Sequence, residues 1–146
     1  MMQGYKNVLA PVDGSKITEK VLETAIQVAK RNNTRLDILN VLEINQFADG
    51  YGGAVSGDVV YKMVDEIETR LRVYQKQAQT AGLTDVEIHV RFGNPKTVIA
   101  QEFPNDHETG LIVVGTTGMN AVERLVVGSV TSYVTRMAKA DVLIVK

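Results

Sequence analysis

The sequence predicts an α/β domain built on a five-stranded parallel sheet with helices on both faces, a Rossmann-like arrangement. The first observation is that short apolar runs alternate with segments of helical spacing along the chain. Such alternation is typical of βαβ units with right-handed crossovers. The second is that the two strongest turn motifs, Asp13-Gly14-Ser15 and the segment from Gly115 onwards, each follow a predicted strand. If both motifs serve one ligand, the first and fourth strands are neighbours, which the strand order 3-2-1-4-5 achieves.

The first part of the chain alternates strand, helix and strand. The apolar run 8–12 predicts a strand that ends at Asp13-Gly14-Ser15. Apolar residues at helical spacing follow from Ile17, and Arg31-Asn32-Asn33 ends that helix. Residues 36–42 are predicted to form the second strand. Residues 43–57 are rich in glycine and poor in strong structure formers, so we expect a long loop of functional importance.

The second part continues the alternation. Asp58 is a candidate cap for a long helix, and Gly82 suits its end. The alternating run 86–90 predicts a half-covered strand near an edge of the sheet. Asn94-Pro95 opens a short third helix that Pro104 closes. The remaining predicted elements are a strand at 111–114, a helix from Ser129 and a strand at 142–145.

The composition is that of one ordinary globular domain. The chain has 146 residues, 45% of them hydrophobic and 23% charged, so we expect a single domain over residues 1–146. The net charge of −1 gives no reason to expect nucleic acid or a membrane surface as a partner. The absence of cysteine excludes disulfides and thiolate metal sites. No apolar run approaches the roughly 18 residues of a membrane-spanning helix, and the first residues do not resemble a signal peptide, so we expect a cytoplasmic protein.

The most informative stretch runs from Gly115 to Thr131, between a predicted strand and a predicted helix. Glycines at 115, 118 and 128 let the backbone approach a ligand, and Ser129 directly follows the last of them. The free N–H groups of a helix's first turn attract phosphate. The pattern is not a P-loop, because no lysine follows the last glycine, and it is not G-x-G-x-x-G. From the glycine spacing alone, nucleotide binding and a tight turn needed for packing are both open.

These residues resemble a known signature. Gly115-x2-Gly118-x9-Gly128-Ser129 is similar to the nucleotide-binding signature of the universal stress protein family. The similarity extends to residues 7–15, to Gly93-Asn94-Pro95 and to residues 142–145, so the resemblance covers essentially the whole chain. It implies the strand order 3-2-1-4-5 and membership of the family's ATP-binding branch.

The resemblance also implies a site for an adenine nucleotide at the carboxyl ends of the strands. Pro11, Val12 and Asp13 would border the adenosine, with Asp13 near the adenine or the ribose. Val41, near the end of the second strand, would lie against the base. The ribose and phosphates would meet, in chain order, Gly115, Gly118, Gly128, Ser129, Val130 and Thr131.

Two departures from the family's pattern concern the closing strand, which often follows a proline where this chain has Asp141, and the residues around the first two glycines. Where the family often carries basic residues, between and soon after the first two glycines, this chain has Thr116-Thr117 and Met119-Asn120. Arg124 is the nearest cation in sequence and a candidate phosphate contact. Fewer positive charges weaken triphosphate binding, so ATP, ADP and AMP are all candidate ligands, with Mg²⁺ as a candidate accompanying ion. For Asp13, ligand contact and a turn or cap role are both open.

Other reactive side chains have plainer interpretations. Ser15 is interpreted as a helix cap. His89 shares a strand face with Glu87 and Arg91, which predicts a surface histidine. His107 lies in a polar stretch with too few suitably spaced ligands for a metal site. The sequence therefore predicts neither catalytic nor metal-binding residues.

The implied function is a nucleotide-responsive stress or regulatory protein. The alternative is an enzyme, either a slow ATPase or a nucleotide-dependent transferase. Phosphoryl transfer needs positioned cations and a group that orients the nucleophile, for which the sequence offers only Arg124 and Asp13. A dimerisation module that has lost nucleotide binding is a third hypothesis, against which the intact glycines argue.

The last strand predicts a homodimer. Residues 142–145 are apolar on both faces, although the order 3-2-1-4-5 places them at the edge of the sheet. An apolar edge strand associates with other chains unless something covers it. Members of the family commonly form homodimers through this strand, so we expect a second copy to cover it.

Overall fold

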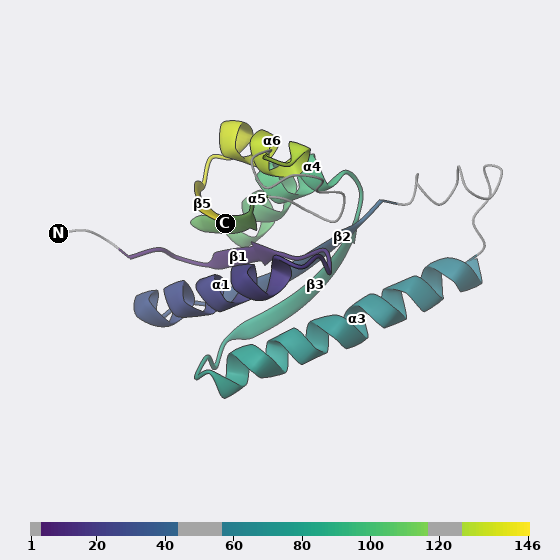
Figure 1. Ribbon diagram of the computed structural model, residues 1–146, viewed down its shortest axis with the longest axis horizontal. Helices are drawn as coiled ribbons and strands as arrows, with labels where there is room; N and C mark the ends of the chain where they lie inside the picture. Colours follow the sequence, from purple (N-terminus) through teal and green to yellow (C-terminus); the bar gives the residue numbers. More distant parts are fainter. Residues whose placement is uncertain (1–3, 44–56, 117–126) are drawn as a thin grey trace.

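The computed structural model describes residues 4–43, 57–116 and 127–146 (Figure 1). Five strands form one sheet in the order β3-β2-β1-β4-β5, and each pair of neighbours is parallel. The predicted fold class is therefore confirmed. The strands are β1 (Val8–Pro11), β2 (Leu36–Leu42), β3 (Val86–Phe92), β4 (Leu111–Gly115) and β5 (Asp141–Val145).

Helices cover both faces of the sheet (Figure 1). Leu22 and Leu71 are fully buried on one face, and Phe103 and Val134 on the other. None of the helices in the described ranges has the length and apolar character needed to cross a membrane. The first face carries α1 (Thr18–Asn32) and α3 (Gly57–Thr80); the second carries α4 (Pro95–Thr97), the π-helical turn η1 (Val98–Glu102), α5 (Phe103–His107) and α6 (Ser129–Met137).

The two long helices follow from the spacing of their apolar residues. On α1, Val21, Ala25 and Ala29 recur every four residues and face the sheet. The helix ends where Asn33 adopts a left-handed conformation with φ 51°. The predicted loop 43–57 falls almost entirely on residues 44–56, which lie outside the described residues. The buried positions of α3 are Ile67, Leu71, Tyr74 and Ala78.

The helical segment after Asn94 runs further than predicted. The side chain of Asn94 caps it by accepting a backbone N–H, as its predicted start requires. The prediction that Pro104 closes the helix is wrong, because α5 continues beyond this residue. The preceding turn widens, and the N–H of Phe103 donates to the carbonyl of Val98, five residues back. A wider turn accommodates the proline ring, which in a regular helix strikes the carbonyl four residues back.

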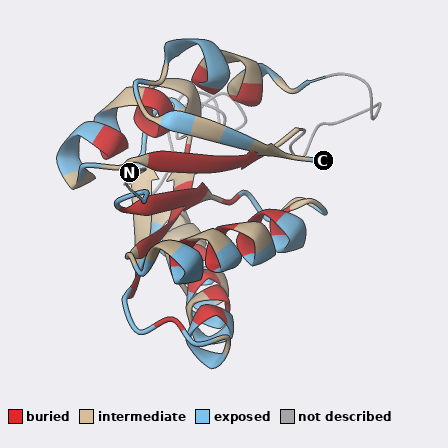
Figure 2. Ribbon diagram, turned by 90° about the vertical axis from the view of Figure 1, so that its left-hand side faces the viewer, coloured by how far each residue is buried: buried red, intermediate tan, exposed pale blue. Residues whose placement is uncertain are grey.

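The two edge strands are less buried than the central ones (Figure 2). β3 buries Val86 but exposes Glu87 and Phe92, which confirms the predicted half-covered strand at an edge. β5 forms the opposite edge and begins at Asp141, one residue earlier than predicted. Its Leu143 side chain is 38% exposed, which is unusual for leucine in a parallel sheet.

Candidate functional site

The sheet splits at its carboxyl edge, between β1 and β4. The ladder between these strands covers two residue pairs and ends at Leu9 and Ile112. β1 nevertheless continues beside β2 as far as Pro11, and β4 beside β5 as far as Gly115. The two central strands therefore stop pairing before they end, where the strand order reverses. Open α/β sheets bind their ligands at such a place, and the predicted positions 11–13 and 115 all lie there.

The turn between β1 and α1 holds Asp13 in a defined position. Val12 is buried, and its N–H donates to the carbonyl of Leu39 at 2.8 Å. Oδ1 of Asp13 accepts the N–H of Ser15 at 2.9 Å and the hydroxyl of Thr18 at 3.4 Å. Within the described part of the chain, Oδ2 of this exposed carboxylate has no hydrogen-bond partner. Asp13 thus has a turn role through one oxygen, and none of the described residues engages its other oxygen.

The prediction that Ser15 caps α1 is wrong. The residue before the helix is Ile17, and no side chain caps the first turn. The hydroxyl oxygen of Ser15 is buried, and no described group bonds to it. Gly14 has φ +79°, a conformation that favours glycine. This left-handed residue turns the chain so that Asp13, rather than Ser15, reaches the residues that open the helix.

Two hydrogen bonds tie the end of β4 to the start of α6. The N–H of Gly128 donates to the carbonyl of Thr116 at 2.8 Å, and the hydroxyl of Thr131 donates to the carbonyl of Gly115 at 2.5 Å. Thr131 is 6% exposed, and its hydroxyl proton is already used in the hydrogen bond to Gly115. The expected hydroxyl donor to a phosphate is then Ser129, which is exposed.

Gly115 has a packing role of its own. A Cβ at this position would lie 2.7 Å from Cγ2 of Ile17, at the start of α1. That distance is too short for a carbon–carbon contact, so glycine is what lets α1 approach the end of β4. Packing against Ile17 therefore explains why this position is a glycine. Any contact of Gly115 with a ligand is made by its backbone.

α6 presents its first N–H groups at this edge. Its first helical hydrogen bond runs from the N–H of Ser132 to the carbonyl of Gly128 at 2.9 Å. The N–H groups of residues 129–131 therefore precede the helical ladder. Gly128 stands before the helix in an extended conformation and, as a glycine, offers no side chain to cap it. An anion could accept hydrogen bonds from these donors and would be favoured by the helix dipole.

The remaining predicted positions differ in how far the structure places them. Pro11 is half-buried at the end of β1. Val41 is half-buried on β2, where it pairs with Arg91 and packs on the face that carries α5 and α6. Gly118 and Arg124 lie outside the described residues, so their contacts with a ligand stay predictions.

Sequence reasoning missed Arg70, a cation that α3 brings to the β1–α1 turn. A Cβ on Gly14 would lie 2.9 Å from Nη1 of Arg70, and Nη2 donates to Oδ1 of Asn40 at 3.0 Å. A signal was present in the sequence. Arg70 follows Ile67 by three residues and precedes Tyr74 by four, so it lies on the buried stripe of its helix.

The prediction that His89 is a surface residue is also wrong. Its Nε2 lies 2.8 Å from Oδ1 of Asp37, which is fully buried, and its ring packs edge-on against Phe103. Nε of Arg35 holds the other oxygen of Asp37 at 3.1 Å. The sequence held a signal for this contact, namely a single aspartate within the otherwise apolar start of β2. A buried carboxylate needs hydrogen-bond or ion-pair partners. His107 ends α5 and stacks on the Phe103 ring, with 4.0 Å between ring centroids.

Asp37, Glu87 and His89 bring three potential metal-ligand atoms within 4.8 Å of one another. Arg35 already balances the charge of Asp37, however, and His89 lies within hydrogen-bond distance of its second oxygen. Glu87 is exposed, and its oxygen is 3.9 Å from Nε2 of His89. This cluster is therefore explained as a polar network that joins β2 to the edge strand β3.

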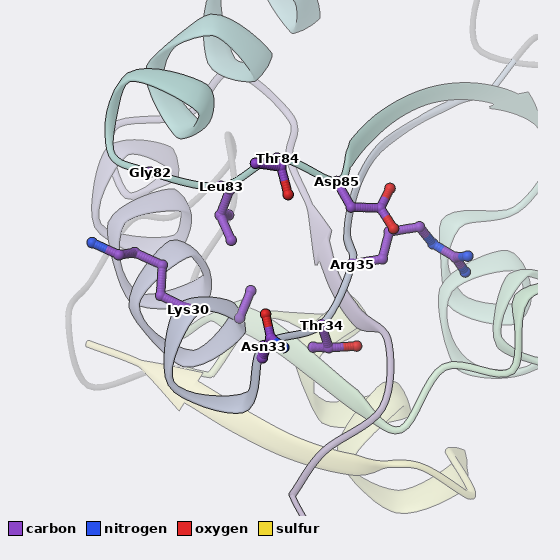
Figure 3. A pocket seen from close by; sticks show the side chains of 9 residues that line it. Lys30, Asn33, Thr34, Arg35, Gly82, Leu83, Thr84 and Asp85 are labelled. Carbon is purple, nitrogen blue, oxygen red and sulfur yellow. The ribbon is translucent and has the colours of Figure 1, made fainter.

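A pocket of about 200 Å³ lies at the opposite edge of the sheet (Figure 3). Residues 29–30, 33–35 and 82–85, which lead into β2 and β3, line it. Figure 3 shows the hydroxyl of Thr84 directed toward the pocket, whereas Lys30 and Arg35 extend away from it. The predicted site residues follow their strands instead of preceding them, so the pocket is separate from the candidate site.

Comparison with known proteins decides the family. The sequence model of the Universal stress protein family matches residues 4–146. The chain belongs to this family. A Staphylococcus haemolyticus protein that carries the family's name is 38% identical over 145 residues, which are 99% of this chain and 87% of that protein.

Solved universal stress proteins share the fold across the whole chain. UspA from Lactobacillus plantarum is 27% identical with a TM-score of 0.77, over 98% of this chain and 99% of that one. A universal stress protein in complex with cAMP is 27% identical with a TM-score of 0.72, over 98% of each chain. The family predicted from the glycine signature is thus confirmed.

Proposed function

We propose that this universal stress protein binds an adenine nucleotide at the split between β1 and β4 and acts as a nucleotide-responsive regulatory protein. The nucleoside lies against the β1–α1 turn and Val41, and the phosphates lie at the start of α6. ATP is the proposed ligand, with ADP and AMP as alternatives. The proposal places the chain in the family's ATP-binding branch.

The observation that carries this proposal is the arrangement at the start of α6. The N–H groups of residues 129–131 precede the first helical hydrogen bond, and the residue before the helix, Gly128, has no side chain that could cap them. Across the split stands Asp13, with one carboxylate oxygen that no described residue engages. The relative in complex with cAMP supports an adenine nucleotide as the ligand. The resemblance of the glycine signature supports the ATP-binding branch.

Nucleotide binding can be tested without choosing the ligand in advance. Purified protein is denatured, and any released nucleotide is identified by its mass. Titration calorimetry then gives affinities for ATP, ADP and AMP, with and without Mg²⁺, and timed analysis of labelled ATP measures hydrolysis. Submillimolar affinity without product formation is the expected result. Absence of carried-over nucleotide together with no heat of binding would refute the proposal.

We expect Asp13→Asn to weaken adenine-nucleotide binding by about tenfold, because a hydrogen bond to a charged group contributes roughly 1.5–3 kcal/mol. The amide oxygen of asparagine can still accept the N–H of Ser15, so the turn keeps its bond. Titration calorimetry measures the change. The matched control is Asp65→Asn, which removes an exposed carboxylate from α3. Unchanged affinity in Asp13→Asn would mean that Asp13 is only a turn residue.

The homodimer through β5 is likewise a proposal. Leu143 is 38% exposed in a strand at the edge of the sheet, and a two-fold partner would cover it and pair its free backbone groups. We expect Leu143→Lys to shift the protein toward monomer, as measured by sedimentation velocity. The control is Val73→Lys, which places the same charge at a 60% exposed apolar position on α3. A wild-type protein that sediments as a monomer at tens of micromolar would contradict this interface.

A further inference from the structure

Arg70, on α3, lies against the β1–α1 turn of the candidate site. Its guanidinium lies between the β1–α1 turn and β2, because Nη1 stands 2.9 Å from where a Gly14 Cβ would be and Nη2 donates to Asn40 at 3.0 Å. Asn40 is 6% exposed, and Arg70 is half-buried. The side chain thus joins α3, the turn and the carboxyl half of β2.

Packing alone does not explain an arginine at this position. Its neighbours on the buried stripe of α3, Ile67, Leu71 and Tyr74, pack against the sheet, and an apolar side chain could do the same at lower desolvation cost. No carboxylate of the described residues forms an ion pair with Arg70, and its Nε–H is buried without a partner. A half-buried cation held by one amide oxygen therefore points to a role beyond helix packing.

The charges of Arg70 and Asp13 both act on the phenol of Tyr74. Burial is the main cause that raises the pKa of the Tyr74 phenol, and the charges of Glu19 and Asp13 raise it further while that of Arg70 lowers it. All three charged groups therefore act on one phenol. Arg70 lies beside Gly14, the residue after Asp13, although the hydrogen bonds of Arg70 and Asp13 are made to different partners.

We propose that Arg70 is a positioning residue of the nucleotide site, which holds the Asp13-Gly14-Ser15 turn in its ligand-binding shape. This inference rests on the proposed function. The planar guanidinium fits under the backbone of Gly14, whose left-handed φ of +79° brings the turn close to it. The Asn40 bond fixes the guanidinium in turn. Because the turn borders the nucleoside, Arg70 acts on recognition of the nucleoside rather than on attraction of phosphate charge.

The ligand series adenosine, AMP and ATP tests this role. We expect Arg70→Met and Arg70→Lys each to weaken binding by about tenfold for all three ligands alike, since neither side chain reproduces the planar fork. Titration calorimetry gives the affinities, and urea unfolding confirms that each variant is folded at the titration temperature. The matched control is Arg72→Met on the same helix, where the native arginine forms a surface ion pair with Glu68. We expect its affinities to equal those of the wild type.

A double-mutant cycle tests the contact itself. Gly14→Ala places a Cβ against the guanidinium and leaves α3 unchanged, and it also strains the backbone at φ +79° to the same extent with or without Arg70. We expect the combined Gly14→Ala, Arg70→Met variant to lose less affinity than the sum of the two single losses, because the clash disappears with the guanidinium. Additive losses would overturn the inference.

The outcomes separate this inference from the proposed function. A wild-type protein that binds none of the three ligands refutes both. Wild-type binding with unchanged affinity in Arg70→Met refutes the role of Arg70 alone. A loss that grows with the number of phosphates and is restored by Arg70→Lys would make Arg70 a source of charge instead of a positioning residue.

Discussion

Gly128→Val is expected to weaken adenine-nucleotide binding by at least about tenfold while the protein remains folded. Gly128 has φ −61° and ψ 155°, values that any residue can adopt, so its backbone conformation does not require glycine. Because Gly128 directly precedes the N–H groups that open α6, we expect a valine side chain there to keep a phosphate away from them. The substitution therefore removes access to these donors with little strain in the backbone.

Titration calorimetry with ATP measures the loss, and circular dichroism confirms the fold. The matched control is Gly57→Val at the start of α3, where a Cβ has nothing within 4 Å. It introduces the same side chain at a glycine that no described residue approaches. ATP affinity in folded Gly128→Val equal to that of the wild type would remove the start of α6 from the site.

Phe103→Ala is expected to cost about 3–5 kcal/mol of the free energy of unfolding, the usual range for a buried phenylalanine. Phe103 is fully buried on the face of the sheet that carries α5 and α6. Its ring stacks on His107, meets His89 edge-on and lies 4.8 Å from Cζ of Arg91. Truncation leaves a cavity and removes the surface that orients His89 toward the buried carboxylate of Asp37.

Urea unfolding measures this loss as a lower midpoint at an unchanged slope. Phe92→Ala is the matched control, because Phe92 ends β3 and is 47% exposed. Its expected effect is within about 0.5 kcal/mol. Equal midpoints for the two variants would show that Phe103 contributes no more to stability than a surface residue.

Local sequence patterns were sufficient to predict most of the helices and strands. Strand and helix depend on periodicities of two and near four residues, which are visible in one stretch of chain at a time. The end of the third helix was mispredicted because proline usually stops a helix, whereas here η1 widens the turn before Pro104. The predicted cap at Ser15 failed because the chain turns at the left-handed Gly14, so that Ser15 donates its N–H to Asp13 and the helix begins only after Ile17.

The candidate site was predictable where its residues follow strands. Parallel strands bring their carboxyl ends to one edge, so the positions after β1 and β4 had to lie near each other once these strands were neighbours. The family signature named the same positions. The hydrogen bond of the Thr131 hydroxyl to Gly115 and the packing of Gly115 against Ile17 could not be predicted, because each depends on one atom of a residue far away in the sequence.

The sequence by itself determined the alternation of strands and helices, the strand order implied by a shared site, and the family. Only the tertiary structure decided which polar side chains meet. His89 reaches Asp37 across 52 positions, and Arg70 reaches Asn40 across 30, because strand register and helix placement align them. Periodicity assigns a side chain to a face of its element, but the partner on that face is set by elements far away in the chain. His89 was therefore mistaken for a surface residue, and Arg70 was missed.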